Sequence, residues 1–394
     1  MEITIYLPTL FYFVTSAFLG LTALNVKQRY RPPLLCLLIV FATLAYRGIT
    51  AQFASLEACH ILCMFLLFYI SHMTCALCME EYVLPTTHQW DWMAAYKMLF
   101  NPRWIGTKRQ APNVKESSSP PQGILSQELK PDTRPASRLK TLRIALASPR
   151  VVFIRNRLFS LFVIYVVGKL YGKLTSLSSE YFDNLGYDDF LPNKRVYLRR
   201  LSQVTARETI IRIWFVIFWN WSTFSTLTKI HDILAIFFVG IGIDEPQDWP
   251  TLYGSLSEAY TMRRFWGKFW HSLVYRSYTS FGIFISTKVF GLPRRSMVGR
   301  LLVNFLVFFL SGCIHALVEL QLGYTCGWWE SIASYSGSFV AILAETVVQW
   351  AFRRLVGRYR GDGVISKAIG YAWVFGYLFW SLPKVQYSKL YCHP

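Results

Sequence analysis

One histidine of this sequence lies inside a long apolar stretch, where an ionisable side chain is unusual. His315 belongs to the segment LLVNFLVFFLSGCIHALVEL, and Asn304, Ser311 and Glu319 recur around it at spacings of seven, four and four residues. On a helix these side chains share one stripe. Polar groups within a membrane face the bundle interior or a cavity, because exposing them to lipid is costly. We therefore expect the stripe to line a hydrated cavity.

An imidazole in such a place can act as a base. Its pKa in water is about 6.5, so the neutral ring can take the proton of an alcohol as the oxygen attacks an acyl carbonyl, and can then return it to the leaving group. We predict this catalytic role for His315, with Glu319 as a residue that orients the ring. The alternative is a histidine that serves only as a hydrogen-bonding group between helices.

A second segment, rich in aromatic and basic residues, precedes His315. It reads DEPQDWPTLYGSLSEAYTMRRFWGKFWHSLVYRSY, from Asp244 to Tyr278. Ser255 and Glu258 predict a capping box, and with it a helix through the rest of the segment. With a period of 3.6 residues that helix is amphipathic. Its polar face carries Arg264, Lys268, His271 and Tyr275, and its apolar face carries Trp266, Trp270 and Leu273. The plain alternative is an interfacial helix that only anchors the chain at the lipid headgroups.

Long apolar stretches surround both segments. The 394-residue chain is 53% hydrophobic and only 16% charged, and whole windows of about twenty residues lack charge, which indicates membrane spans. These runs are too continuous for the alternating strands of a barrel. We predict an all-α, polytopic membrane bundle of about 8–10 transmembrane helices. The expected spans are 3–25, 33–54, 58–79, 151–171, 209–228, 230–243, 277–292, 299–320, 332–352 and 364–383.

The net charge of +19 resides mainly between the apolar stretches. Membrane topology explains it, so no nucleic-acid partner is expected. Lys27, Arg29 and Arg31 place the first turn in the cytosol, and the next two spans return the chain there. The basic segment that follows includes residues 111–138, whose composition predicts disorder. We expect three parts, namely an amino-terminal three-span region at 1–84, a basic, partly disordered cytosolic loop at 85–150 and a core at 151–394.

The two chemical segments together resemble a known family. Residues 249–271 and the SGCIH sequence at 311–315 look like the wax-synthase-like branch of the membrane-bound O-acyltransferases. In that family an FW-x-x-x-W-[N/H] element precedes a catalytic histidine in a hydrophobic helix. Many members carry Asn at its last position, and the His form resembles fungal proteins that acetylate terpenoid or meroterpenoid alcohols. The resemblance covers about residues 200–385. The matching positions are Phe265, Trp266, Trp270, His271 and His315.

This resemblance implies an integral membrane O-acyltransferase that moves an acyl group, acetyl by expectation, from acyl-CoA to a hydroxyl of a lipophilic secondary metabolite. His315 would be the base and His271 an auxiliary polar residue in the same chamber. Acyl-CoA would bind from the cytosolic side as a cosubstrate, and the alcohol would enter from the bilayer. We expect a multi-pass integral membrane protein of the endoplasmic reticulum. Clustered cations suit a polyanionic cosubstrate, and Arg matches phosphate geometry. The expected cosubstrate-binding residues are Arg263, Arg264, Lys268, Arg276, Trp266 and Trp270.

Two other functions stay open at this point. A magnesium-dependent membrane prenyltransferase or cyclase would use acidic groups, although the acidic residues stand among Pro, Gly and Asn without regular DxxxD spacing. A non-enzymatic transporter would use the same intramembrane polar residues, although no internal repeat is present. No metal site is expected, because the CxxC of Cys75 and Cys78 has no second pair. The acidic patches are Asp183, Asp188 and Asp189, and Asp244, Glu245 and Asp248.

Overall fold

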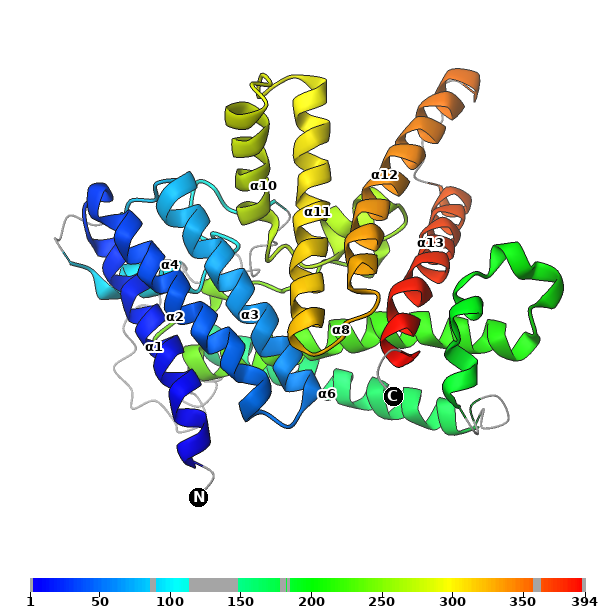
Figure 1. Cartoon of the computed structure of the whole chain (residues 1–394), viewed down its shortest axis with the longest axis horizontal. Helices are drawn as coiled ribbons and strands as arrows, with labels where there is room; N and C mark the ends of the chain where they lie inside the picture. Colours follow the sequence, from blue (N-terminus) through cyan, green and yellow to red (C-terminus); the bar gives the residue numbers. More distant parts are fainter. Residues whose placement is uncertain are drawn as a thin grey trace, which may run out of the picture.

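The structure is a computed structural model that describes residues 3–85, 90–112, 148–177, 182, 185–356 and 363–391. Within these residues the secondary structure is helical and contains no strand (Figure 1). Seven of the described helices are long and apolar enough to cross a membrane. The predicted all-α polytopic bundle is therefore confirmed. Residues 113–138 of the stretch predicted to be disordered lie outside the described residues, as does Asp183.

The amino-terminal region is a group of three helices that pack around Ala23, Leu38 and Tyr69. They are α1 (Ile3–Asn25), α2 (Arg31–Gln52) and α3 (Leu56–Thr74), which continues as a π-helical turn at Cys75–Met79. The Arg31 guanidinium donates a hydrogen bond of 2.7 Å to the Tyr82 carbonyl. The turn after α1 and the chain after α3 therefore lie at the same end of the bundle, as the charge pattern predicts.

The remaining helices follow from residue 92 onward. They are α4 (Trp92–Leu99), α6 (Pro149–Leu177), α8 (Ala206–Gly240), α9 (Met262–Arg264), α10 (Tyr275–Phe284), α11 (Met297–Gln321), α12 (Trp328–Val356) and α13 (Val364–Tyr391). In Figure 1, α10, α11 and α12 rise steeply like α1, α2 and α3, whereas α6 and α8 run across beneath them. Short 3₁₀ turns lie at Gln28–Tyr30, Tyr187–Phe190, Pro192–Arg195, Leu198–Gln203, Pro246–Asp248 and Leu256–Glu258, and π-helical turns also at Phe265–Phe269 and Ile285–Val289.

The helix α8 corrects one prediction. The expected spans 209–228 and 230–243 form a single helix of 35 residues. Lys229, His231 and Asp232 lie at or near the expected boundary, and none of them is a helix breaker. Asp232 is fully buried and accepts a 2.8 Å hydrogen bond from Arg157 of α6, so this charge is satisfied inside the bundle. A buried, paired charge can lie in the middle of a helix without ending it.

Packing between α3 and α11 joins the amino-terminal region to the rest of the chain. Cys63 and Leu66 of α3 are buried against Val318 of α11. The Tyr46 hydroxyl of α2 also donates a 2.7 Å hydrogen bond to the Leu317 carbonyl. These contacts fix the amino-terminal helices against the helix that carries His315.

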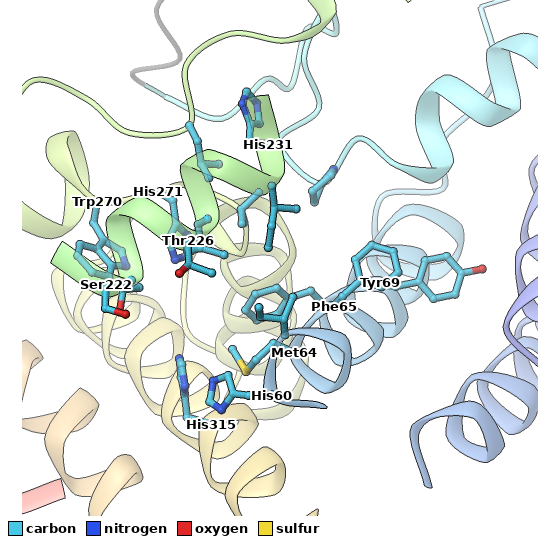
Figure 2. Close-up of a pocket in the computed structure, with 18 of the residues that line it drawn as sticks. His60, Met64, Phe65, Tyr69, Ser222, Thr226, His231, Trp270, His271 and His315 are labelled. Atoms are coloured by element: carbon cyan, nitrogen blue, oxygen red, sulfur yellow. The ribbon is translucent and has the colours of Figure 1, made fainter. Parts of the chain in front are cut away.

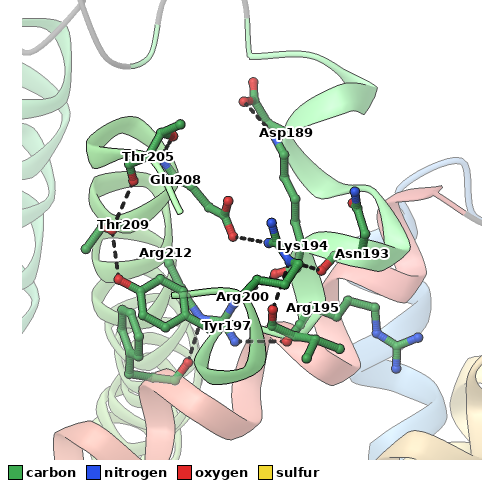
Figure 3. A network of polar contacts seen from close by, with 12 residues as sticks. Asp189, Asn193, Lys194, Arg195, Tyr197, Arg200, Thr205, Glu208, Thr209 and Arg212 are labelled. Carbon is green, nitrogen blue, oxygen red and sulfur yellow. Dashed lines mark hydrogen bonds and ion pairs between the residues drawn. The ribbon is translucent and has the colours of Figure 1, made fainter. Parts of the chain in front are cut away.

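A polar network fastens the segment before α8 (Figure 3). Arg212 is fully buried and donates to the Phe379 carbonyl at 2.8 Å and to the Lys194 carbonyl at 2.9 Å. Thr205 caps α8, since its hydroxyl accepts the Glu208 N–H at 3.1 Å. Such capping satisfies a backbone donor that the first turn leaves free. The network ties α8 to α13.

Candidate active site

The RRFWGKFWH segment folds differently from the predicted amphipathic helix. Ser255 begins only a short 3₁₀ turn, and a new turn starts at Thr261, whose hydroxyl accepts the Arg264 N–H. A π-helical turn follows at Phe265–Phe269, and Trp270 has an extended backbone, so the helix ends there. The next helix, α10, begins at Tyr275. The polar face predicted from Arg264 to Tyr275 is therefore wrong.

Tertiary contacts explain why the segment leaves the helix. The Gly254 N–H donates a 2.8 Å hydrogen bond to the Phe269 carbonyl, which ties the turn to the chain before it. Trp270 is buried and stacks on Trp219 of α8, with ring centroids 5.9 Å apart. Burial of such a large ring outweighs the small preference of each residue for a regular helix. The turn directs Trp266, Trp270 and His271 into the interior.

His271 lies just after this turn, in the loop before α10 (Figure 2). Burial, together with the nearby charge of Arg103, lowers the pKa of His271 to about 4. The ring is therefore neutral at physiological pH. Among the described residues, the buried Nδ1 of His271 and the buried Nε1 of Trp266 have no hydrogen-bond partner. Buried polar groups are normally paired, and both of these side chains line the site.

His315 lies in the lower half of α11 and contacts α12. Its Nε2 is 2.7 Å from the Tyr335 hydroxyl, and the two rings stack with centroids 4.7 Å apart. Gly312 permits this close approach, because a Cβ there would come within 2.7 Å of the Ile332 Cα. Tyr335 was not predicted as a site residue, because a tyrosine in an apolar span carries no distinctive sequence signal.

Glu319 was predicted to orient the His315 ring, but in the structure it binds other residues. It is buried and accepts a 2.6 Å hydrogen bond from the Ser331 hydroxyl, and it forms a 2.7 Å ion pair with Lys389 of α13. The Tyr335 hydroxyl occupies the place beside the imidazole instead. Glu319 therefore links α11, α12 and α13, and its charge is balanced by Lys389.

Two large cavities meet at His315. One has a volume of about 1090 Å³ and extends between α3, α8 and the carboxy-terminal helices. We call it the apolar cavity because most of its wall is apolar, although Lys97, Arg103, Lys389 and four carboxylates also line it. The other has a volume of about 1540 Å³ and is called the basic cavity, because several arginines line it. Residues common to both walls are Phe68, Trp266, Trp270, His271, His315 and Tyr335.

The predicted polar stripe on α11 follows these cavities. Asn304 and Ser311 line the basic cavity, Glu319 lines the apolar cavity, and His315 lines both. The expectation that the stripe faces a cavity is confirmed. The helix thus presents one histidine at the boundary between two spaces of different character.

The predicted cosubstrate-binding cations divide into two groups. Arg263, Arg264 and Lys268 line the basic cavity. Arg276 lies apart from them, because the chain turns before α10. It forms a 2.6 Å ion pair with Glu80 and stands over the Trp104 ring. Arg276 therefore connects α10 to the amino-terminal region.

Two further arginines of the basic cavity were not predicted, namely Arg300 and Arg353. Arg300 lies in the first turn of α11 and Arg353 in the last turn of α12, which are the upper ends of these helices in Figure 1. Both are far from the RRFWGKFWH motif in sequence, so no spacing pattern could connect them to it. Glu258 pairs with Arg264 and with Lys268, whereas within the described residues Arg263, Arg300 and Arg353 have no carboxylate partner.

Four of the acidic residues that suggested a magnesium enzyme are paired with cations or donors. Asp189 binds Arg207 at 2.9 Å, and although burial opposes it, this hydrogen bond lowers the pKa of Asp189. In the second patch, Asp244 accepts the Trp249 indole N–H, Glu245 pairs with Arg150, and Asp248 pairs with Lys97. In the part of the chain that the structure describes, no group of three or more His, Cys, Asp or Glu side chains is arranged to hold a metal ion.

Comparisons with known proteins identify a family to which part of this chain is similar. Residues 249–340 match the model of the membrane bound O-acyl transferase family, and this stretch contains the turn, His315 and Tyr335. No solved structure matches the chain. The resemblance stated from the sequence motifs is therefore confirmed for the part of the chain that carries the site.

Several curated fungal acetyltransferases are similar to the chain. Acetyltransferase atnC of Arthrinium sp is 37% identical over 180 residues, which are 45% of this chain and 40% of that protein. Acetyltransferase aurG of Calcarisporium arbuscula is 32% identical over 59% of this chain and 55% of its own. Acetyltransferase ataH of Aspergillus terreus is 36% identical over 38% of this chain and 48% of its own. The similarity thus spans about half the length of these relatives.

Proposed function

We propose that the chain is an acyl-CoA-dependent O-acyltransferase of the membrane, which moves an acetyl group to a hydroxyl of a lipophilic secondary metabolite such as a terpenoid or meroterpenoid. One observation carries the proposal. His315 stands where a basic cavity and an apolar cavity meet. A transfer between a polyanionic donor and an apolar acceptor requires such a junction, because each substrate needs its own environment and the reacting atoms must meet at one base.

The basic cavity suits the donor. Coenzyme A carries several phosphate charges, and arginine guanidinium groups bind phosphate with two parallel hydrogen bonds. Arg263, Arg300 and Arg353 are exposed at this cavity and lack a carboxylate partner within the described residues. Arg300 and Arg353 lie at the end of the bundle that the positive-inside rule assigns to the cytosol. Trp266 and Trp270 would form the wall beside the acyl group.

The apolar cavity suits the acceptor. Its volume of about 1090 Å³ is in the range of pockets that enclose small-molecule ligands. Phe65, Met64 and Leu227 belong to its mainly apolar wall. A lipophilic alcohol would reach it from the surrounding bilayer. The amino-terminal helix α3 forms part of this wall, so the core at 151–394 would require the region at 1–84 to complete its site.

The reaction follows from the two partners of His315. With the Nε2–H donating to the Tyr335 oxygen, Nδ1 holds the lone pair that acts as the base. The alcohol oxygen attacks the thioester carbonyl while its proton passes to Nδ1. The C–S bond then breaks, and Nδ1 returns the proton to the sulfur, so that the ester and free coenzyme A are formed. The closed chamber would keep water from the thioester.

An assay of microsomes that contain the protein tests this proposal. Radiolabelled acetyl-CoA is supplied with a panel of sesquiterpenoid and meroterpenoid alcohols, with and without EDTA. We expect labelled ester and free coenzyme A in equal amounts, and no effect of the chelator. Activity that requires magnesium and an allylic diphosphate would instead support the prenyltransferase. Absence of ester from every alcohol would contradict the proposed function.

A further inference from the structure

A second histidine, His60, faces the chamber from the amino-terminal region. It lies near the start of α3, whose first turn is capped by the Ser55 hydroxyl. His60 and His315 both line the apolar cavity, and Figure 2 shows their rings next to each other, one from α3 and one from α11. The neighbours Cys59 and Cys63 are buried in the α3–α11 contact. That contact fixes the position of His60 along the cavity.

The ring of His60 is not used for packing between helices. Among the described residues, neither of its nitrogens has a hydrogen-bond partner in the protein. By contrast, His72 on the same helix has Nε2 2.8 Å from the Met98 carbonyl, and His231 contacts Asp232 at 3.3 Å. Lys389 and Glu319, which line the same cavity, form an ion pair with each other at 2.7 Å. The ring nitrogens of His60 can therefore form hydrogen bonds with a molecule bound in the cavity.

We propose that His60 binds the oxygen of the acceptor alcohol opposite His315, an inference that rests on the proposed function. The neutral ring donates its N–H to one lone pair of the alcohol oxygen. The O–H of the alcohol is then free to point to Nδ1 of His315, and the second lone pair attacks the thioester carbonyl. His60 keeps its own proton throughout, so the alcohol proton passes only through His315 to the departing sulfur.

This arrangement gives the amino-terminal region a part in the chemistry. A hydroxyl that lies between two imidazoles is held by a donor and an acceptor at once, which fixes its orientation. Orientation of the reacting groups is a large source of rate enhancement. The region at 1–84 therefore supplies a substrate-binding group as well as a wall.

Two substitutions of similar length separate hydrogen bonding from packing. His60→Gln retains an N–H donor, whereas His60→Met fills the same space without one. Both are compared with wild type in microsomes, with radiolabelled acetyl-CoA and the sesquiterpenoid alcohol that wild type acetylates fastest. We expect kcat/KM for the alcohol to fall about tenfold in His60→Met, as for loss of one hydrogen bond, and to recover largely in His60→Gln. The KM for acetyl-CoA should stay within about twofold in both variants.

The outcomes distinguish this inference from the proposed function. If wild type acetylates the alcohol and the Met and Gln variants are equally active, His60 does not bind the acceptor, while the proposed function stands. A rise of the KM for acetyl-CoA as large as the fall of kcat/KM for the alcohol would also overturn the inference. If wild type acetylates no alcohol of the panel, the proposed function fails, and the inference fails with it. Should the Met variant not accumulate, His60→Leu replaces it as the apolar partner of Gln.

Discussion

The hydroxyl of Tyr335 decides how the imidazole of His315 can work. It lies 2.7 Å from Nε2, which leaves Nδ1 as the nitrogen that would act as the base in the proposed reaction. A neutral imidazole has one N–H and one lone pair. The lone pair is on Nδ1 only if Nε2 carries the hydrogen, and the proposed reaction uses this tautomer, with the Tyr335 oxygen as acceptor. In the proposed reaction, the residue that orients the base is therefore the phenol of Tyr335 on the next helix.

Tyr335→Phe removes this acceptor and keeps the stacked ring. We expect kcat for acetyl transfer to fall about tenfold, because part of the histidine population takes the wrong tautomer, with little change in the KM for acetyl-CoA. Tyr377→Phe is the control, since that hydroxyl lines the same cavity but contacts Ser338 and the Ser334 carbonyl. An equal loss in both variants would show that Tyr335 acts only through general packing.

The buried His271 makes stability depend on pH. Its pKa is lowered to about 4 in the folded chain, against about 6.5 when unfolded. Between these values the unfolded chain binds the proton more tightly, so this contribution to stability is complete above pH 6.5 and is lost as the pH falls toward 4. We expect the unfolding temperature in detergent to fall more for wild type than for His271→Asn between pH 7.5 and 5. Parallel curves would contradict this.

At the scale of elements, the π-helical turn at Phe265–Phe269 is the feature that builds the site. The sequence allowed prediction of which aromatic residues take part, because Trp266 and Trp270 stand out by type. It did not allow prediction of their direction. The period of 3.6 residues assumes an unbroken helix, whereas the Gly254–Phe269 hydrogen bond and the Trp219–Trp270 stack impose a break. Both are contacts between separate parts of the chain, which no local pattern contains.

Gly254 tests this element directly. A Cβ at this position would lie 2.0 Å from the Lys268 carbonyl oxygen, a backbone atom that can move only with the turn. We expect Gly254→Ala to destabilise the fold by about 1–3 kcal/mol and to reduce acetyl transfer by displacing Trp270. Gly376→Ala on α13 is the control, because a Cβ there meets nothing within 4 Å. Thermal unfolding and activity are measured for both. If Gly254→Ala is as stable and as active as wild type, the close approach of Gly254 to the Lys268 carbonyl is contradicted.

At the scale of the whole molecule, the two cavities divide the chamber by charge. Membrane spans, the all-α class and the stripe on α11 followed from hydropathy and helical period. Arg300 and Arg353 did not, because they join the basic cavity only when α11 and α12 pack side by side. The same holds for His60, since nothing in the local sequence of α3 indicates that it faces His315. Residues that meet through tertiary packing are the ones that sequence patterns miss.

Adjacent arginines at the end of α12 test the role of the basic cavity. Arg353 lines this cavity, whereas Arg354 stands over the Trp350 ring. We expect Arg353→Gln to raise the KM for acetyl-CoA several-fold with little effect on the KM for the alcohol, since one phosphate contact is lost. Arg354→Gln should match wild type. Steady-state kinetics with each substrate varied in turn gives both constants. The same KM for acetyl-CoA in the two variants would argue against donor binding at this cavity.

The most direct test is the rate of acetyl transfer by His315→Ala at saturating acetyl-CoA and alcohol, measured in microsomes with equal amounts of folded, inserted protein. Loss of a general base reduces rates by about 10²–10⁴-fold. We predict a loss of that size, with acetyl-CoA still bound by the basic cavity. A folded His315→Ala protein that transfers acetyl groups at the wild-type rate would contradict His315 as the base.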